Sequence, residues 1–142
     1  MTTFNKFNQF VEDLAEGVHN FTSDATCSIT VALCAAANAP VATNTVLANL
    51  TQISYTNLSS RVVSIASSGQ TSGTWKLTLS DLVLTASGAV ATFRYVVLYN
   101  DDPTSPADPL IGWYDYGADV TLANLETFTI DFDGSGGAIT LA

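Results

Sequence analysis

Side chains able to act as a nucleophile or a general base are scarce in this sequence. It has one histidine, His19, and two cysteines, Cys27 and Cys34. A serine or cysteine nucleophile needs a base within reach, usually histidine, and the sequence contains no G-x-S-x-G motif. His19 follows a predicted helix, where the negative end of the helix dipole favours a charged imidazole, and we predict that structural role for it. The protein is therefore predicted not to be an enzyme.

Paired carboxylates are the other catalytic arrangement to consider. A glycosidase holds two of them ~5–9.5 Å apart. Asp115 is the only acid with three aromatic residues within two positions, Trp113, Tyr114 and Tyr116, on which a sugar could stack. Because aromatic strands more often belong to a core, the core interpretation is preferred here.

Metal binding and disulfide formation are also disfavoured. Zinc needs three or four Cys or His ligands, and the spacing of these residues is poor. The segment 131–135 resembles the start of a calcium loop, but position 12 of such a loop would be Ala142 instead of a glutamate. Acids of the loop 100–108 could hold a cation, although acids in turns are usually solvated. On one strand Cys27 and Cys34 would lie about 23 Å apart, beyond the ~7 Å that a disulfide allows. We predict free thiols, no metal and no cofactor.

The charge balance argues against two classes of partner. The chain has 13 acids and 4 bases, a formal net charge of −9. Nucleic-acid binding needs clustered Lys and Arg, whereas these bases are scattered singly as Lys6, Arg61, Lys76 and Arg94.

No apolar run approaches the ~20 residues of a membrane helix, and no signal peptide is visible. We predict no binding to nucleic acid or membrane.

The residues from 93 to 116 predict the central element, a β-hairpin. Its two strands, 93–99 and 110–116, are dense in aromatic and β-branched residues. Between them lie Asn, Asp and Pro residues, which end strand pairing because proline lacks an N–H and Asn and Asp bond the local backbone. We expect this hairpin to be the heaviest part of the core.

One amphipathic helix is predicted near the N-terminus. Within 4–21, apolar residues recur at steps of three and four. Thr2 or Thr3 can cap its start and Gly17 can end it, so a helix or arm is expected over 4–17. A helix this short is marginal alone. It therefore either covers a face or end of the sheet or docks on another subunit. The pattern is formed by Phe4, Phe7, Val11, Leu14 and Val18, with Phe10 beside them.

From residue 25 onward the apolar period changes from 3.6 to 2. The alternation over 27–33 predicts a strand with one wet face, and 45–53 predicts a helical turn before a strand at Ser54. Turns are predicted at 68–73 and a bulge at Asp81. About eight strands with short turn spacing favour a β-sandwich or jelly-roll-like fold, all-β, as a single domain over 1–142. The other strands are expected at 61–67, 75–79, 82–84, 120–122, 128–132 and 138–141.

Several longer phrases of the sequence are distinctive: FNKFNQFVEDLAEGVHN (4–20), APVATNTVLANLTQI (39–53), SGQTSGTWKLTL (68–79), FRYVVLYNDDPTSPADPLIGWYDYG (93–117) and the closing TFTIDF and ITLA. Together they resemble small proteins encoded in the structural-gene regions of tailed bacteriophages. The resemblance covers nearly the whole chain and departs at 25–37, where a cysteine-containing segment replaces a polar strand. It implies a virion structural protein, foremost a capsid decoration (cement) protein, made in the host cytoplasm and placed on the outer surface of the capsid.

The resemblance implies partners as well. These are the major capsid protein and further copies of the chain, as a dimer or trimer. Such a protein acts by burying area, about 1,600 Å² in a standard interface, anchored by aromatic and aliphatic side chains. The alternative is a tail- or fibre-associated receptor-binding module that uses the aromatic hairpin on a host glycan. Candidate interaction residues are Phe4, Phe7, Phe10, Val11, Leu14, Tyr95, Trp113 and Tyr116.

Overall fold

The computed structural model describes residues 2–22 and 27–142. The predicted all-β class and the helix near the N-terminus are confirmed. Asp24 and the first two residues of the segment where the period changes, 25 and 26, lie outside the described residues. The elements are β1 (Phe4–Lys6), α1 (Asn8–Ala15), β2 (Ile29–Cys34), η1 (Ala36–Asn38), η2 (Leu47–Asn49), β3 (Val62–Val63), β4 (Ile65–Thr71), β5 (Thr74–Leu79), β6 (Leu82–Thr85), β7 (Phe93–Asn100), β8 (Leu110–Val120), β9 (Thr127–Ile130) and β10 (Ile139–Leu141).

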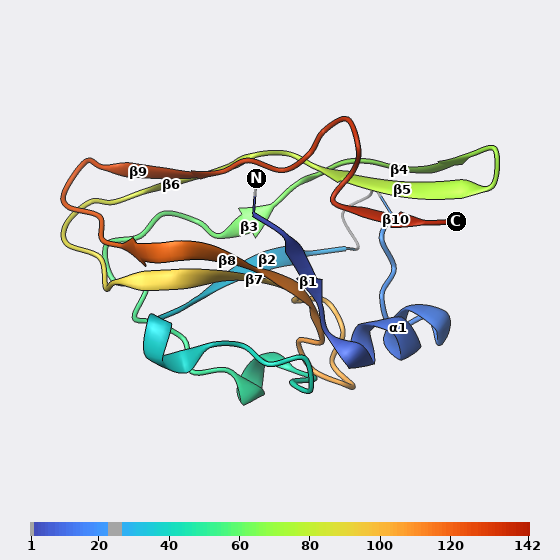
Figure 1. The fold of residues 1–142 in the computed structure, drawn as a ribbon, viewed down its shortest axis with the longest axis horizontal. Coiled ribbons are helices and arrows are strands. Elements are labelled where there is room, and N and C mark those ends of the chain that lie inside the picture. The colour runs from blue at the N-terminus through green and yellow to red at the C-terminus, as the bar shows by residue number, and fades with distance from the viewer. Residues whose placement is uncertain (1, 23–26) are drawn as a thin grey trace.

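The strands form two layers (Figure 1). One layer is a five-stranded sheet in the order β1-β8-β7-β2-β3, with every neighbouring pair antiparallel. The other holds β10-β5-β4 and, beyond it, β6-β9. Only Ser80 and Asp81 separate β5 from β6, so the two pieces lie one after the other in the same layer. Asp81 Oδ1 accepts a hydrogen bond from Phe132 N at 3.0 Å, so a side chain replaces a ladder bond where a bulge was predicted.

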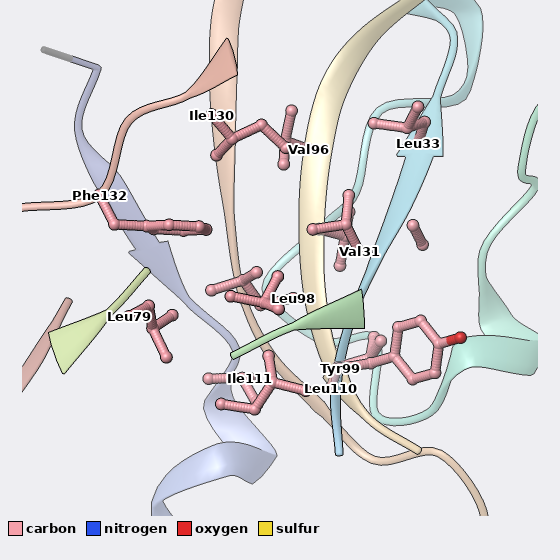
Figure 2. Close-up of a cluster of buried hydrophobic side chains, with 14 of the residues drawn as sticks. Val31, Leu33, Leu79, Val96, Leu98, Tyr99, Leu110, Ile111, Ile130 and Phe132 are labelled. Carbon is pink, nitrogen blue, oxygen red and sulfur yellow. The ribbon is translucent and has the colours of Figure 1, made fainter. Parts of the chain in front are cut away.

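The predicted central hairpin is present as β7 and β8. Val96 pairs with Tyr114 and Val97 with Trp113. Burying each large aliphatic side chain between the layers contributes roughly 1.5–3 kcal/mol, which makes this hairpin the main support of the core. Figure 2 shows the larger sheet and the second layer meeting in one buried cluster that includes Val31, Leu33, Leu79, Val96, Leu98, Ile130 and Phe132.

The strand β2 corrects one prediction. A half-wet strand was expected, but all six residues of β2 are buried. The irregular segment that follows it, with η1 and η2, passes over the other face of the sheet (Figure 1). Tyr55 Oη accepts from Leu33 N at 3.0 Å and Ile53 N donates to Leu33 O at 3.0 Å. The predicted helical turn is confirmed as η2, whereas the strand predicted at Ser54 is wrong, because that segment has no ladder of its own.

The N-terminal helix is shorter than predicted. The expected helix over 4–17 is wrong at its start, because β1 pairs with the edge of β8 and α1 begins only at Asn8. Neither predicted threonine cap is used; Asn8 N instead donates to Ala42 O at 2.9 Å. The predicted end at Gly17 is confirmed: its φ is +78°, and Val18 N donates to Asp13 O at 2.8 Å. This is the glycine-ended turn that satisfies the last helical carbonyls.

Two further boundaries differ from the sequence prediction. The strand expected over 61–67 is divided into β3, which joins the larger sheet, and β4, which joins the other layer. The turn expected over 68–73 is confined to Ser72 and Gly73, both with positive φ, 52° and 84°. Such a two-residue turn matches the twist of the strands it joins, so β4 continues to Thr71.

Candidate functional site

A cleft of about 690 Å³ lies between the two layers. It opens on the side where β1 and β9 are the outermost strands of their sheets. The residues that characterise it come from β1, β8, β9 and the segment after β9. They are the aromatic residues Phe4, Tyr114, Tyr116 and Phe128 and the acids Asp131 and Asp133. We call this set the edge cleft.

The aromatic side chains of the edge cleft pack against each other from both layers. The rings of Phe4 and Tyr114 have centroids 5.3 Å apart. Tyr116 and Phe128 also lie 5.3 Å apart, edge to face at 80°. Burial raises the pKa of Tyr114 to about 12, so its hydroxyl stays uncharged. Tyr116 is 51% exposed and stands at the open part of the cleft.

The acids give the edge cleft a negative rim. Asp131 is exposed and Asp133 is half-buried. Asp133 Oδ1 accepts from Ser135 N at 2.9 Å and from Gly136 N at 2.6 Å, which fixes its orientation. Lys76 of β5 contacts this loop, because its Nζ donates to Ser135 O at 2.8 Å. No Lys or Arg is among the described residues that line the cleft.

The structure separates the predicted hairpin residues onto opposite faces. Tyr116 lines the edge cleft together with Phe4 of β1. Trp113 is one residue away from Tyr114, and alternate residues of a strand face opposite sides. Its ring instead lies 4.5 Å from that of Phe7. Tyr95 lies opposite Asp115 in the ladder, so these two aromatic residues belong to the other face of the sheet.

The N-terminal residues predicted as an interaction face are mostly internal. Phe7 and Phe10 are 0% and 3% exposed, so both side chains pack inside this chain. Phe10 packs on His19 and Phe21 with ring centroids 5.2 and 6.1 Å away. Because α1 lies against β8, the helix covers an end of its own sheet, the first of the two predicted alternatives. The outer members of that face are Leu14, half-buried, and Val11, 51% exposed.

His19 also differs from its predicted role. It is 5% exposed, and burial lowers its pKa to about 4, with Asp13 opposing that shift. It is therefore uncharged near neutral pH, whereas a charged imidazole on the helix dipole was predicted. Its Nδ1 lies 3.4 Å from Asn100 Nδ2. Nε2 of His19 and Oδ2 of buried Asp13 have no hydrogen-bond partner within the described residues. Burial explains the difference: the His19 ring packs against Phe10 of the helix, with the centroids 5.2 Å apart.

Other reactive chemistry is limited in the described part of the chain. No three or more His, Cys, Asp or Glu residues there are grouped to hold a metal ion. Cys27 and Cys34 form no disulfide, as predicted. Burial raises the pKa of the Cys34 thiol to about 11. None of the described helices has the length and apolar character needed to cross a membrane.

Several residues of the edge cleft were not identified from sequence. The alternation at 128–132 predicts that Phe128 points inward, but it does not reveal that Tyr114 forms the facing wall. For Asp131 and Asp133 the sequence predicts only acids of a solvated turn. Comparison of the chain with protein families, curated proteins and solved structures finds no match.

Proposed function

We propose that this protein is a structural component of a tailed-phage virion, a capsid decoration protein that attaches to the outer surface of the shell. The sequence phrases that resemble such proteins motivate the assignment. The edge cleft carries it, because aromatic side chains in a hollow at the border of two sheets are suitable anchors for another protein. Tyr116 is the exposed aromatic member of that hollow.

The mechanism of such a protein is mass action. A ligand that binds one state of the shell stabilises that state by RT ln(1 + [L]/Kd), or about 2.7 kcal/mol per site at one hundred times Kd. Many subunits acting together raise the resistance of the expanded shell to internal pressure. This mechanism needs burial of apolar surface and no reactive group.

The proposal is tested by mixing purified protein with undecorated phage heads. We expect the protein to sediment with the heads and to raise their disruption temperature. Tyr116→Ala is expected to weaken attachment at least about tenfold, because it removes an exposed aromatic anchor. Val83→Ala is the matched control, since Val83 is 50% exposed on β6 and does not line the edge cleft. Absence of sedimentation, or equal effects of the two substitutions, would refute the proposal.

One observation also favours the receptor-binding alternative. An exposed aromatic ring, Tyr116, stands in the same cleft as the exposed carboxylate Asp131, and this combination can also hold a sugar. Antibody labelling of virions separates the two functions. Label over the whole shell supports decoration, whereas label confined to one vertex supports a tail or fibre module.

A further inference from the structure

We propose that the edge cleft binds an extended segment of a different protein, in which apolar side chains alternate with Lys or Arg. The inference rests on the proposed function only for the source of that segment, which would be the shell protein. The specificity itself follows from the edges, the lining and the charge of the cleft.

The strand edges beside the cleft suit an extended peptide. Within the described residues β9 pairs only with β6, and β1 pairs only with β8. Each therefore has an outer row of backbone N–H and C=O groups that a further strand can pair with. Phe128 and Ile130, two residues apart on β9, both line the cleft. That spacing matches the two-residue period with which an added strand presents its own side chains.

The charge of the cleft selects a cationic segment. Asp131 and Asp133 line it, and no base does so among the described residues. Asp133 is already held by Ser135 N and Gly136 N. Asp131 is exposed at the rim, which leaves its carboxylate as the group placed to receive an incoming Lys or Arg. The chain as a whole carries −9, so its field also favours a basic partner.

A second copy of this chain does not supply such a segment. Of its 4 Lys and Arg residues, Arg94 is paired with Asp115 at 2.7 Å, and Lys76 is bound to the Ser135 carbonyl. Arg61 lies over the Tyr55 ring, with Cζ 3.6 Å from the centroid. Lys6 is the only base on β1, a strand of 3 residues. The basic strand must therefore come from another polypeptide.

A sugar fits the cleft less well than a peptide does. Sugars stack on the flat faces of aromatic rings. Here Phe128 is occupied on two sides, by Phe93 at 88° and by Tyr116 at 80°, both with centroids at 5.3 Å. Phe4 is tilted 52° against Tyr114. The regular spacing of N–H and C=O groups along a free strand edge matches a peptide backbone, which has the same spacing, and does not match a sugar.

The test uses the full chain and a synthetic probe peptide, acetyl-Lys-Val-Lys-Val-Lys-Val-Lys-amide, with its Glu-for-Lys counterpart as the control peptide. Calorimetric titration in low salt is expected to show binding of the Lys peptide only, weakening as salt rises. Asp131→Asn is expected to reduce the affinity up to about fivefold, as for loss of an exposed ion pair. Asp102→Asn is the matched control, because Asp102 is an exposed acid in the loop of the β7–β8 hairpin and does not line the cleft.

The outcomes separate this inference from the proposed function. No binding of the Lys peptide, equal binding of the Glu peptide, or equal losses for Asp131→Asn and Asp102→Asn would overturn the inference. Displacement of the peptide by an oligosaccharide that binds more tightly would also overturn it. If the peptide binds as expected while phage heads do not, the decoration role fails and the specificity of the cleft stands. If phage heads bind and the peptide does not, the decoration role stands and the proposed specificity of the cleft fails.

Discussion

His19 makes the stability of this fold depend on pH. The pKa of histidine is ordinarily 6.5, and burial lowers that of His19 to about 4. Between these values the unfolded chain binds a proton that the folded chain does not bind. The free energy of unfolding is therefore at its full value above pH 6.5 and falls as the pH is lowered toward 4. Asp13, the charged neighbour, favours the protonated ring and is already included in that pKa.

The expected loss follows from the size of the pKa shift. Each pKa unit corresponds to 1.36 kcal/mol, so the lowering of the His19 pKa to about 4 gives a loss of up to about 3 kcal/mol. That is a large part of the 5–15 kcal/mol typical of a domain. The Asp115 carboxylate, whose pKa is lowered below 3.8 mainly by its hydrogen bond from Arg94, acts in a more acidic window. The two groups are thus distinguishable by pH.

The assay is urea unfolding followed by tryptophan fluorescence at several pH values between 4 and 7.5, with the wild type and His19→Gln compared. The variant is less stable at neutral pH but carries no group that titrates in this window at position 19. Its free energy of unfolding should therefore change less with pH than that of the wild type. NMR of the imidazole gives a direct control, because its signals should stay those of a neutral ring down to about pH 4. Equal pH slopes for both proteins, or a ring that titrates near 6.5, would refute this reasoning.

Two further predictions test the packing. Gly112→Ala should destabilise the fold by roughly 1–3 kcal/mol, because a Cβ at this position would collide with the ring of Phe4 and with Asn5 O; a urea midpoint equal to that of the wild type would show that β1 is not seated on β8. Cys34 is 0% exposed and its pKa is raised to about 11, so in a Cys27→Ser background a thiol reagent at pH 8 should react only at the rate of unfolding. Immediate reaction would contradict the burial of β2.

The strands of the core were predictable because their pattern is local. Alternation of apolar and polar residues is enough to find β5 and β9, and the density of aromatic and β-branched residues finds both arms of the central hairpin. The start of the N-terminal helix was not predictable in this way. Phe4 and Phe7 fit the helical period, yet residues 4–6 pair with β8, whose free edge is set by residues about a hundred positions away. Gly112 completes that fit, because the Phe4 ring occupies the space that a side chain there would need.

The solvent-exposed face predicted for β2 was wrong for the same physical reason, a contact with a segment that is distant in the sequence. Thr30 and Ala32 are small residues that either face of a sheet accepts, and only the segment with η1 and η2 decides that they are covered. That segment has little regular structure, so no periodicity of apolar residues in the sequence indicates where it packs. Burial of an entire strand is in this case a property of the chain that crosses it.

The edge cleft was predictable only in part, because some of its residues show a local sequence pattern and others are placed by distant contacts. Aromatic residues at 4 and 116 were expected to lie at a surface, and the structure places both in one hollow. Phe128 of β9 and Asp131 just after it join them from the second layer, a neighbourhood that no local sequence pattern indicates. Among the large apolar side chains that are exposed in the described residues, Tyr116 is the one aromatic side chain. Its exposure leaves apolar area in water at about 25 cal/mol per Å², and a partner that covers the cleft recovers that free energy. An unpaired strand edge, an open aromatic wall and an exposed carboxylate therefore favour the same kind of ligand, an extended basic polypeptide.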